Sequence, residues 1–251
     1  MLLKDRNAIV YGGGGSIGGA VAGAFAREGA TVFLAGRTQP KLEAVVERIR
    51  AAGGAAEAAL VDALDERAVD EHANRVAAQA GSIDVSFNLI SQGDVQGTPL
   101  VEMGLDDFMR PVITTVSSMF ITARAAARHM IRQGSGVILA FGGYGDPLRD
   151  HNLGGLQVAF GAVESLRRNL AAELGPHGIR VVTLQTGGVP ESIPEDFEGR
   201  DAIARMTDEK TLLGRAATLA DVGNAAAFAA SDWARTMTAT QLNITCGAEV
   251  D

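Results

Sequence analysis

Short apolar runs alternate with helical patterns along most of the chain. Most of the runs are continuous, which is typical of strands buried on both faces of a parallel sheet. Strands are predicted over residues 7–11, 31–35, 57–61, 84–90, 136–141, 179–184 and 241–245. Between the second and third of these runs, Leu42, Val45, Val46 and Ile49 repeat at the spacing of one helix face, with Pro40 near the expected helix start. Further helices are predicted over 105–133, 153–174 and 219–231.

The alternation predicts an α/β fold, a single Rossmann-type doubly wound parallel sheet of about seven strands with helices on both faces. No repeat, linker or low-complexity boundary divides the sequence, so we expect one domain over residues 1–251. Sheets of this kind bind ligands beyond the carboxyl ends of their strands. The candidate site is therefore expected in the loops that follow the strands.

A block of glycines, Gly12 to Gly15, separates the first predicted strand from a helical pattern. Glycine lets the backbone turn tightly and approach a ligand closely. The start of a helix presents free N–H groups and a positive dipole end to an anion. This order of strand, glycine turn and helix predicts a phosphate-binding turn, with Gly12, Gly15, Ser16 and Ile17 as contacts. A flexible loop is the alternative that a glycine run alone leaves open.

The end of the second predicted strand indicates which dinucleotide is bound. Folds that select NAD usually place an acidic residue here to bind the ribose hydroxyls. This chain has Gly36 and then Arg37. A guanidinium can hold a 2′-phosphate that a carboxylate would repel. We therefore expect Arg37 to bind the cofactor and NADP(H) to be preferred over NAD(H); the alternative is that Arg37 is a surface arginine.

Polar residues also follow the third and fourth predicted strands. Asp62 can accept a hydrogen bond from an adenine amino group or cap the next helix, and Ala63 follows it. Asn88 can brace the floor of its loop or contact the cofactor, and the sequence leaves both interpretations open. Together with Ile90, these residues complete the expected cofactor site.

Composition narrows the classes of function. The net charge is -8 and no basic run stands out, which argues against a nucleic-acid or acidic-membrane partner. No apolar run is long enough to span a bilayer and no signal-peptide pattern is seen, so we expect a cytoplasmic protein. The only cysteine is Cys246, and the four histidines show no ligand spacing, so no metal site is predicted.

Taken together, these residues resemble the short-chain dehydrogenase/reductase family over nearly the whole chain. Tyr11, Gly12, Ser16 and Gly18 stand at the positions of that family's Thr-Gly-x-x-x-Gly-x-Gly turn. The other matching segments are Asp62, Asn88, residues 170–181, Gly214-Arg215, residues 228–232 and residues 242–244. The resemblance implies a nicotinamide cofactor, a small-molecule substrate and a homo-oligomer, either a dimer or a tetramer built on the two long helices.

The family's catalytic residues are Asn, Ser, Tyr and Lys. Thr115, Gly143, Leu156 and Phe160 stand at those positions in this chain. None of the last three can supply the proton, the charge or the hydroxyl of the residue it replaces, so no catalytic residue is assigned. Tyr144 and His151 are candidates for a replacement acid. Ordinary loop chemistry is favoured for two further polar residues of the expected cleft, Ser91 and Gln92.

Two functions follow from this combination. The first is an NADP(H)-dependent oxidoreductase with a relocated or absent proton donor, acting on an activated C=C or C=N bond. The second is a catalytically inactive dinucleotide-binding protein that serves as a partner subunit or NADP(H) sensor. A cleft that holds another ligand is a weaker third option. Residues 188–213 occupy the family's substrate-lid position, and their composition does not identify a substrate.

Overall fold

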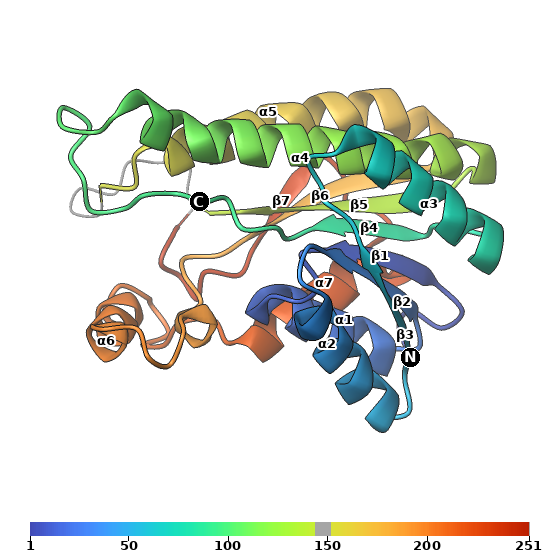
Figure 1. The fold of residues 1–251 in the computed structure, drawn as a ribbon, viewed down its shortest axis with the longest axis horizontal. Helices are drawn as coiled ribbons and strands as arrows, with labels where there is room; N and C mark the ends of the chain where they lie inside the picture. The colour runs from blue at the N-terminus through green and yellow to red at the C-terminus, as the bar shows by residue number, and fades with distance from the viewer. Residues whose placement is uncertain (144–151, 251) are drawn as a thin grey trace.

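The computed structural model describes residues 1–143 and 152–250. In it, a parallel sheet of seven strands has the order β3-β2-β1-β4-β5-β6-β7 (Figure 1). The strands are β1 (Asn7–Tyr11), β2 (Thr31–Gly36), β3 (Ala55–Leu60), β4 (Val85–Asn88), β5 (Gly136–Gly142), β6 (Ile179–Gln185) and β7 (Thr240–Asn243). The strand order reverses beside β1, which pairs with both β2 and β4. The predicted doubly wound α/β fold is confirmed.

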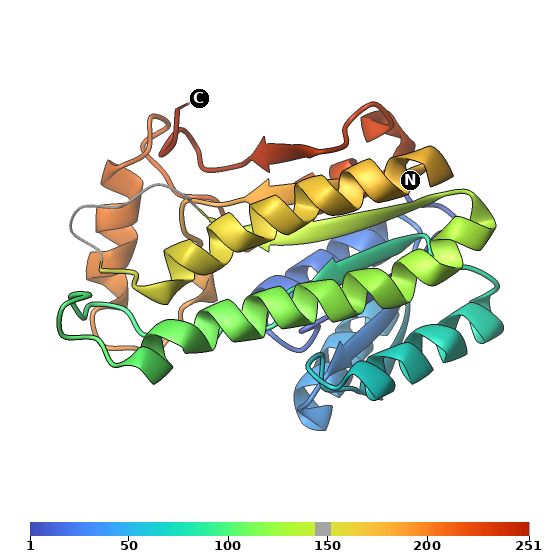
Figure 2. The same cartoon turned by 90° about the horizontal axis from the view of Figure 1, so that it is seen from above.

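Helices cover both faces of the sheet. The α-helices are α1 (Ser16–Arg27), α2 (Gln39–Ala51), α3 (Glu66–Ala80), α4 (Leu105–Gln133), α5 (Gly155–Leu174), α6 (Arg200–Glu209) and α7 (Leu219–Ala230). The short 3-10 helices are η1 (Gly175–His177), η2 (Pro190–Ser192) and η3 (Asp232–Ala234). Helices α1, α2 and α7 pack on one face and α3, α4 and α5 on the other (Figure 1). Seen from above, α4 and α5 run side by side, and α6 lies apart, beyond the carboxyl ends of β6 and β7 (Figure 2).

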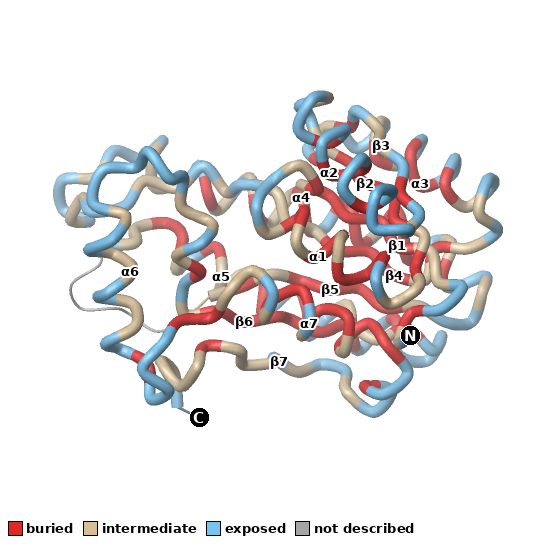
Figure 3. Tube along the Cα trace, turned by 90° about the horizontal axis from the view of Figure 1, so that it is seen from below, coloured by how far each residue is buried: buried red, intermediate tan, exposed pale blue. Residues whose placement is uncertain are grey.

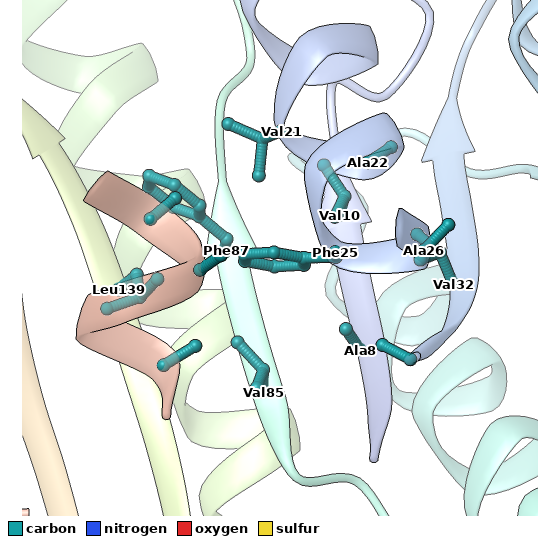
Figure 4. Close-up of a cluster of buried hydrophobic side chains, with 14 of the residues drawn as sticks. Ala8, Val10, Val21, Ala22, Phe25, Ala26, Val32, Val85, Phe87 and Leu139 are labelled. Atoms are coloured by element: carbon teal, nitrogen blue, oxygen red, sulfur yellow. The ribbon is translucent and has the colours of Figure 1, made fainter. Parts of the chain in front are cut away.

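The core consists of two apolar layers, one on each face of the sheet. In the layer under α1 and α7, Phe25 of α1 meets Phe87 of β4, with Val10 and Leu139 beside them (Figure 4). Burying one such aromatic side chain contributes about 1.5–3 kcal/mol. Burial is concentrated along β1, β2, β4, β5 and β6, and much of α6 is exposed (Figure 3). The buried core is therefore centred on the sheet, and the loops after its strands project from it.

The structure changes several predicted boundaries. Strand β3 covers 55–60 rather than 57–61, β4 covers 85–88 rather than 84–90, and β7 covers 240–243 rather than 241–245. Helix α6 lies inside the segment 188–213, for which the sequence predicted no helix. Over the ranges 1–143 and 152–250, no helix combines the length and the apolar character needed to cross a membrane.

Candidate cofactor cleft

A cleft of about 700 Å³ opens at the carboxyl ends of the central strands. Its walls are the glycine turn, the loop after β2, the loop after β3, the segment after β4 and one side of α4. The predicted cofactor residues that line it are Gly12, Gly15, Ser16, Ile17, Arg37, Asp62, Ala63 and Ile90. Residues from four separate loops thus meet in one place, beside the reversal of the strand order.

The glycine turn is shaped by close backbone contacts. Gly12 has φ +76°, a conformation that favours glycine, and a Cβ on it would overlap the carbonyl oxygen of Leu89. A Cβ on Gly18 would overlap the carbonyl oxygen of Gly12. Because α1 begins directly after this turn, both contacts fix the direction in which the helix points.

The N-terminus of α1 faces the cleft without a side-chain cap. Gly15 is its N-cap, and the first turn contains no acidic residue. The backbone amides of Ser16 and Ile17 have no acceptor among the described residues. Uncapped amides at the positive end of a helix dipole form a binding site for an anion such as a phosphate.

The charge of the cleft is opposite to that of the whole chain. Arg37, Lys41 and Arg110 line it, and Asp62 is the single carboxylate among its described lining residues. The chain as a whole carries -8. The side chain of Lys41 packs against Gly14 of the glycine turn. Arg37 lines the cleft in the loop after β2. Arg110 is held on the other wall by an ion pair of 2.7 Å with Asp107.

Asp62 does not cap the next helix, so that alternative was wrong. Its Oδ1 accepts a hydrogen bond from the Leu64 amide at 3.0 Å, within its own loop. The N-cap of α3 is Asp65, whose side chain accepts from the Ala68 amide at 3.0 Å. Asp62 therefore remains on the cleft wall next to Ala63.

Asn88, which the sequence grouped with the cofactor residues, lines a small cavity that shares Ile90, Gln92 and Phe141 with the cleft. Its Nδ2 donates to Ser118 Oγ at 2.8 Å, and its Oδ1 accepts from the Ile90 amide at 3.3 Å. These two bonds tie the end of β4 to α4 and to its own loop, as the bracing interpretation expected. The cavity beside Asn88 has a volume of about 20 Å³, which is room for one water. Thr115 Oγ1 lies at this cavity, buried and without a partner among the described residues.

Apolar side chains of α5 lie beside the end of β5. Leu156 is buried in α5, and Phe160 lies one helical turn later. A Cβ on Gly143 would lie 2.6 Å from the ring of Phe160, so the ring occupies the space that a side chain at position 143 would need. Phe141, two residues before Gly143, lines the cleft itself. The described part of this region contains no acid at these positions.

The described tyrosine, Tyr11, is not available as a proton donor. Its hydroxyl is buried without a partner, and burial raises its pKa far above the usual value. Its ring meets the edge of His72 at 6.0 Å between centroids. Burial, and secondarily the charge of Arg75, lowers the pKa of His72 to about 4. Tyr144 and His151, the candidates for a replacement acid, lie outside the described residues.

Sequence reasoning missed several lining residues. Lys41 and Arg110 were not predicted, and neither was Thr114 of α4. Lys41 stands in the first turn of α2, just after the loop that carries Arg37, and that place in the sequence was the available signal. Ser91 and Gln92 line the cleft as well, and Ser192 reaches it from η2. In the part of the chain that the structure describes, no group of His, Cys, Asp or Glu side chains is placed to hold a metal.

Comparisons with known proteins agree with this geometry. A family model described as enoyl-(acyl carrier protein) reductase matches residues 13–249. The chain is 32% identical over 260 residues to the L-rhamnose 1-dehydrogenase (NAD(P)(+)) of Azotobacter vinelandii, and the match covers 98% of each chain. It is 28% identical over 229 residues to the gluconate 5-dehydrogenase of Gluconobacter oxydans, covering 91% of this chain and 89% of that one. A crystal structure of a short chain dehydrogenase from Burkholderia cenocepacia in complex with NADP matches with a TM-score of 0.86, 27% identity and 100% coverage of both chains.

Proposed function

Because the chain belongs to the short-chain dehydrogenase/reductase family, we propose that it is an NADP(H)-binding oxidoreductase that works without the family's tyrosine and lysine. Family members are oxidoreductases that bind a nicotinamide dinucleotide. The finer points, the preference for NADP(H) and the unusual chemistry, rest on the residues of this chain.

The observation that carries the proposal is the pairing of Arg37 and Lys41 at the glycine turn. Both line the cleft where the loop after β2 meets the start of α1, and no acidic residue stands there. A carboxylate at this place would bind ribose hydroxyls, whereas two cations suit a 2′-phosphate. The amides of Ser16 and Ile17 are proposed to hold the pyrophosphate. The NADP complex of the similar structure agrees with this assignment without deciding it.

The chemistry must differ from that of the family. Bound NADPH would supply a hydride, and a carbonyl substrate would also need a proton in the transition state. General acid catalysis contributes about 10²–10⁴ in rate. Leu156 and Phe160 cannot provide this acid catalysis. The chain's lysines are Lys4, Lys41 and Lys210, so no lysine stands at either position. The proposed substrates are therefore molecules that need little help from an acid, such as an activated C=C or C=N bond.

The first experiment is a calorimetric titration of the cofactor-stripped protein with NADPH and then with NADH. We expect NADPH to bind more tightly, and Arg37→Asp to weaken NADPH binding by about tenfold or more, since a charged hydrogen bond contributes about 1.5–3 kcal/mol. NADH binding should change much less. Arg67→Asp, on the exposed side of α3, is the matched control. Unchanged NADPH affinity in Arg37→Asp would remove Arg37 from the site, and no binding of either dinucleotide would overturn the proposal.

A second candidate is a non-catalytic NADP(H)-binding protein, such as a partner subunit or a sensor. It is favoured by one observation, the apolar packing of Phe160 on Gly143 where the family has polar catalytic groups. The two candidates differ in turnover. NADPH binding without oxidation across carbonyl, enone, imine and iminium panels would favour the second.

We also propose that the chain forms one domain and assembles as a homo-oligomer through α4 and α5. Ile113 and Phe120 of α4 are exposed large apolar side chains, and so is Val158 of α5. The two helices lie side by side on the outside of the molecule (Figure 2). Sedimentation velocity with an Ile113→Glu variant tests this assembly, because a charge in a buried interface dissociates it.

A further inference from the structure

The proposed cofactor contacts use only part of the cleft wall. In the proposed function, the amides at the start of α1 hold the pyrophosphate, and Arg37 and Lys41 hold the 2′-phosphate. The wall formed by the segment after β4 and by α4 carries a third cation, Arg110, which these contacts leave without a ligand. Since the substrate is the second ligand of the cleft, the charge of this wall acts on the substrate.

Arg110 is held at the cleft by the loop after β4. A Cβ on Gly93 would lie 3.3 Å from Cδ of Arg110, so the stem of the arginine packs on that loop. Its Nη1 lies 3.5 Å from the carbonyl oxygen of Gly93, and its Nη2 donates to Oδ1 of Asp107 at 2.7 Å. The N–H group of its Nε has no acceptor among the described residues. The guanidinium is thus positioned by its stem and retains donor groups for a ligand.

The ion pair with Asp107 leaves Arg110 available for binding. Both side chains are about half exposed, and exposed ion pairs contribute little to stability. Asp107 is not among the residues that line the cleft, and the single carboxylate among the described lining residues is Asp62, in the loop after β3. A ligand anion in the cleft can therefore share the guanidinium with Asp107 or displace that carboxylate at small cost.

Three neutral side chains add hydrogen-bonding groups to the same wall. Ser91 and Gln92 follow β4, and Thr114 stands one helical turn after Arg110 on α4. None of these three side chains has a hydrogen-bond partner among the described residues. Hydroxyl and amide groups can donate to a ligand oxygen. The wall therefore offers one guanidinium and several neutral donors to an oxygen-rich group.

The charge of this wall matches a carboxylate. A guanidinium binds a carboxylate through two parallel hydrogen bonds. One guanidinium beside neutral donors balances a single negative charge. A phosphate ester carries more negative charge, and the other wall of the cleft, which has two cations and a helix N-terminus, suits that group.

We propose that the substrate of this cleft bears a carboxylate and that Arg110 binds this group and selects for it. The inference rests on the proposed function, because it names the substrate class of the same site. Phe141, which also lines the cleft, provides an apolar surface for the carbon framework of such a molecule.

The test compares carboxylates with their own methyl esters in protein saturated with NADP+. The acids are 4-oxopentanoate, 3-oxocyclohexane-1-carboxylate and 4-oxo-4-phenylbutanoate, which have a linear, a cyclic and an aromatic framework. Each is the product of reducing a C=C bond conjugated to a ketone, and the oxidised cofactor has no hydride to give it. In calorimetric titrations, we expect the carboxylate of at least one pair to bind about tenfold more tightly than its ester, because hydrogen bonds to a charged group are the stronger ones.

Two variants of Arg110 separate its charge from its geometry. Arg110→Gln should weaken binding of the preferred carboxylate by about tenfold and change binding of its ester by less than about twofold. Arg110→Lys should keep part of the preference, because lysine retains the charge but cannot form the two parallel bonds. Raising the salt from about 20 to 200 mM should weaken binding of the carboxylate and not that of the ester.

The matched control is Arg128→Gln. Arg128 stands on the same helix, is about half exposed and pairs with Asp70 at 2.8 Å, but it does not line the cleft. The variant changes the net charge equally and should leave the affinities for the acids and esters as they are. An equal loss of carboxylate affinity in Arg110→Gln and Arg128→Gln would show that only net charge matters and would overturn the proposal.

The Kd for NADP+ distinguishes a substrate carboxylate from the phosphates of the dinucleotide as the anion that Arg110 binds. It should change by less than about twofold in Arg110→Gln. Arg37→Asp should instead weaken NADP+ binding and leave the carboxylate preference of the saturated protein unchanged. A loss of NADP+ affinity in Arg110→Gln as large as that in Arg37→Asp would assign the guanidinium to the dinucleotide and overturn the proposal.

The remaining outcomes separate this inference from the proposed function. If NADP+ binds and none of the acids is preferred over its ester, the substrate class is wrong and the oxidoreductase proposal stands. If a preference exists but persists in Arg110→Gln, another residue causes it and the role of Arg110 is overturned. If neither NADPH nor NADH binds to the wild type, the proposed function itself fails, and this is seen before any acid is added.

Discussion

Gly143 and Phe160 form a coupled pair at the end of β5. The ring of Phe160 lies where a Cβ on residue 143 would be, 2.6 Å away. A serine, like any side chain, is therefore excluded at position 143 as long as the ring is in place. Positions 143 and 160 are thus coupled by packing, and a larger residue at position 143 alone would disturb it.

The pair predicts a non-additive effect on stability. Gly143→Ala should lower the free energy of unfolding by about 1–3 kcal/mol, because the new methyl overlaps a packed aromatic ring. In a Phe160→Ala background the same change should cost much less, since the ring is gone. Urea unfolding of the wild type, Gly143→Ala, Phe160→Ala and the double variant measures the coupling between the two positions. Equal costs in both backgrounds would contradict the contact.

His72 predicts part of the pH dependence of folding. Its pKa is lowered to about 4 in the folded protein, against an ordinary value of about 6.5. Above pH 6.5 the side chain is neutral in both states. Below it, the unfolded chain binds a proton that the folded chain resists, so stability is lost as the pH falls towards 4. The loss between pH 7 and pH 5 is about 2 kcal/mol.

Urea unfolding at pH 7 and pH 5 tests this effect. His72→Gln should flatten the pH dependence between these values, at some cost in stability at both. His177→Gln is the control, because His177 is exposed in η1. A slope that is unchanged in His72→Gln would assign the acid sensitivity to other groups.

The sequence predicted the site residues that act through the backbone or stand directly after a strand. Gly12 and Arg37 are examples, since their positions follow from the strand–turn–helix order. It could not predict Arg110, which reaches the cleft from α4 because that helix packs across the sheet. The contact between Phe160 and Gly143 was also invisible, because it joins a helix face to the end of a strand through tertiary packing.

Among the elements, α1 depends most on its glycines, and they differ in what they meet. A methyl on Gly18 would overlap the Gly12 carbonyl oxygen, whereas a methyl on Gly23 would meet no atom within 4 Å. Gly18→Ala should destabilise the protein by about 1–3 kcal/mol and weaken NADPH binding. Gly23→Ala should stabilise it by about 0.5–1 kcal/mol, because alanine is the better helix former. Chemical unfolding and a dinucleotide titration of both variants distinguish the packing role of Gly18 from an effect of helix propensity. Loss of stability in both variants would contradict the prediction.

The accuracy of the predicted elements follows the strength of their side-chain patterns. Strands β1, β2, β5 and β6 were predicted to within one residue, because each is a continuous apolar run. Strand β3 has the sequence Ala-Ala-Glu-Ala-Ala-Leu, which contains no strong strand former. Its limits are set by pairing with β2, from Thr31 opposite Ala55 to Gly36 opposite Leu60. The ends of β3 are therefore determined by its pairing with β2 and not by its own sequence.

At the scale of the whole molecule, cofactor binding should be coupled to folding. The cleft draws on four loops and on α4, so a bound dinucleotide connects segments that are far apart in the sequence. NADPH at about 100 times its Kd should raise the free energy of unfolding by about 2.7 kcal/mol. NADH at the same concentration should raise it less. Thermal unfolding with each dinucleotide measures the difference, and Arg37→Asp should remove the advantage of NADPH; equal shifts would contradict the preference.

The strand order also determines when the cleft forms during translation. Apart from Phe141 and Ser192, the described residues that line the cleft all lie between Tyr11 and Thr114. Strands β3, β2, β1 and β4 are neighbours in the sheet, so this half closes on itself without waiting for a later strand. The ribosome thus synthesises most of the cleft residues before it reaches β5, β6 and β7. We expect dinucleotide in the cell to meet the nascent chain at this stage and to act as a folding ligand before the later strands exist.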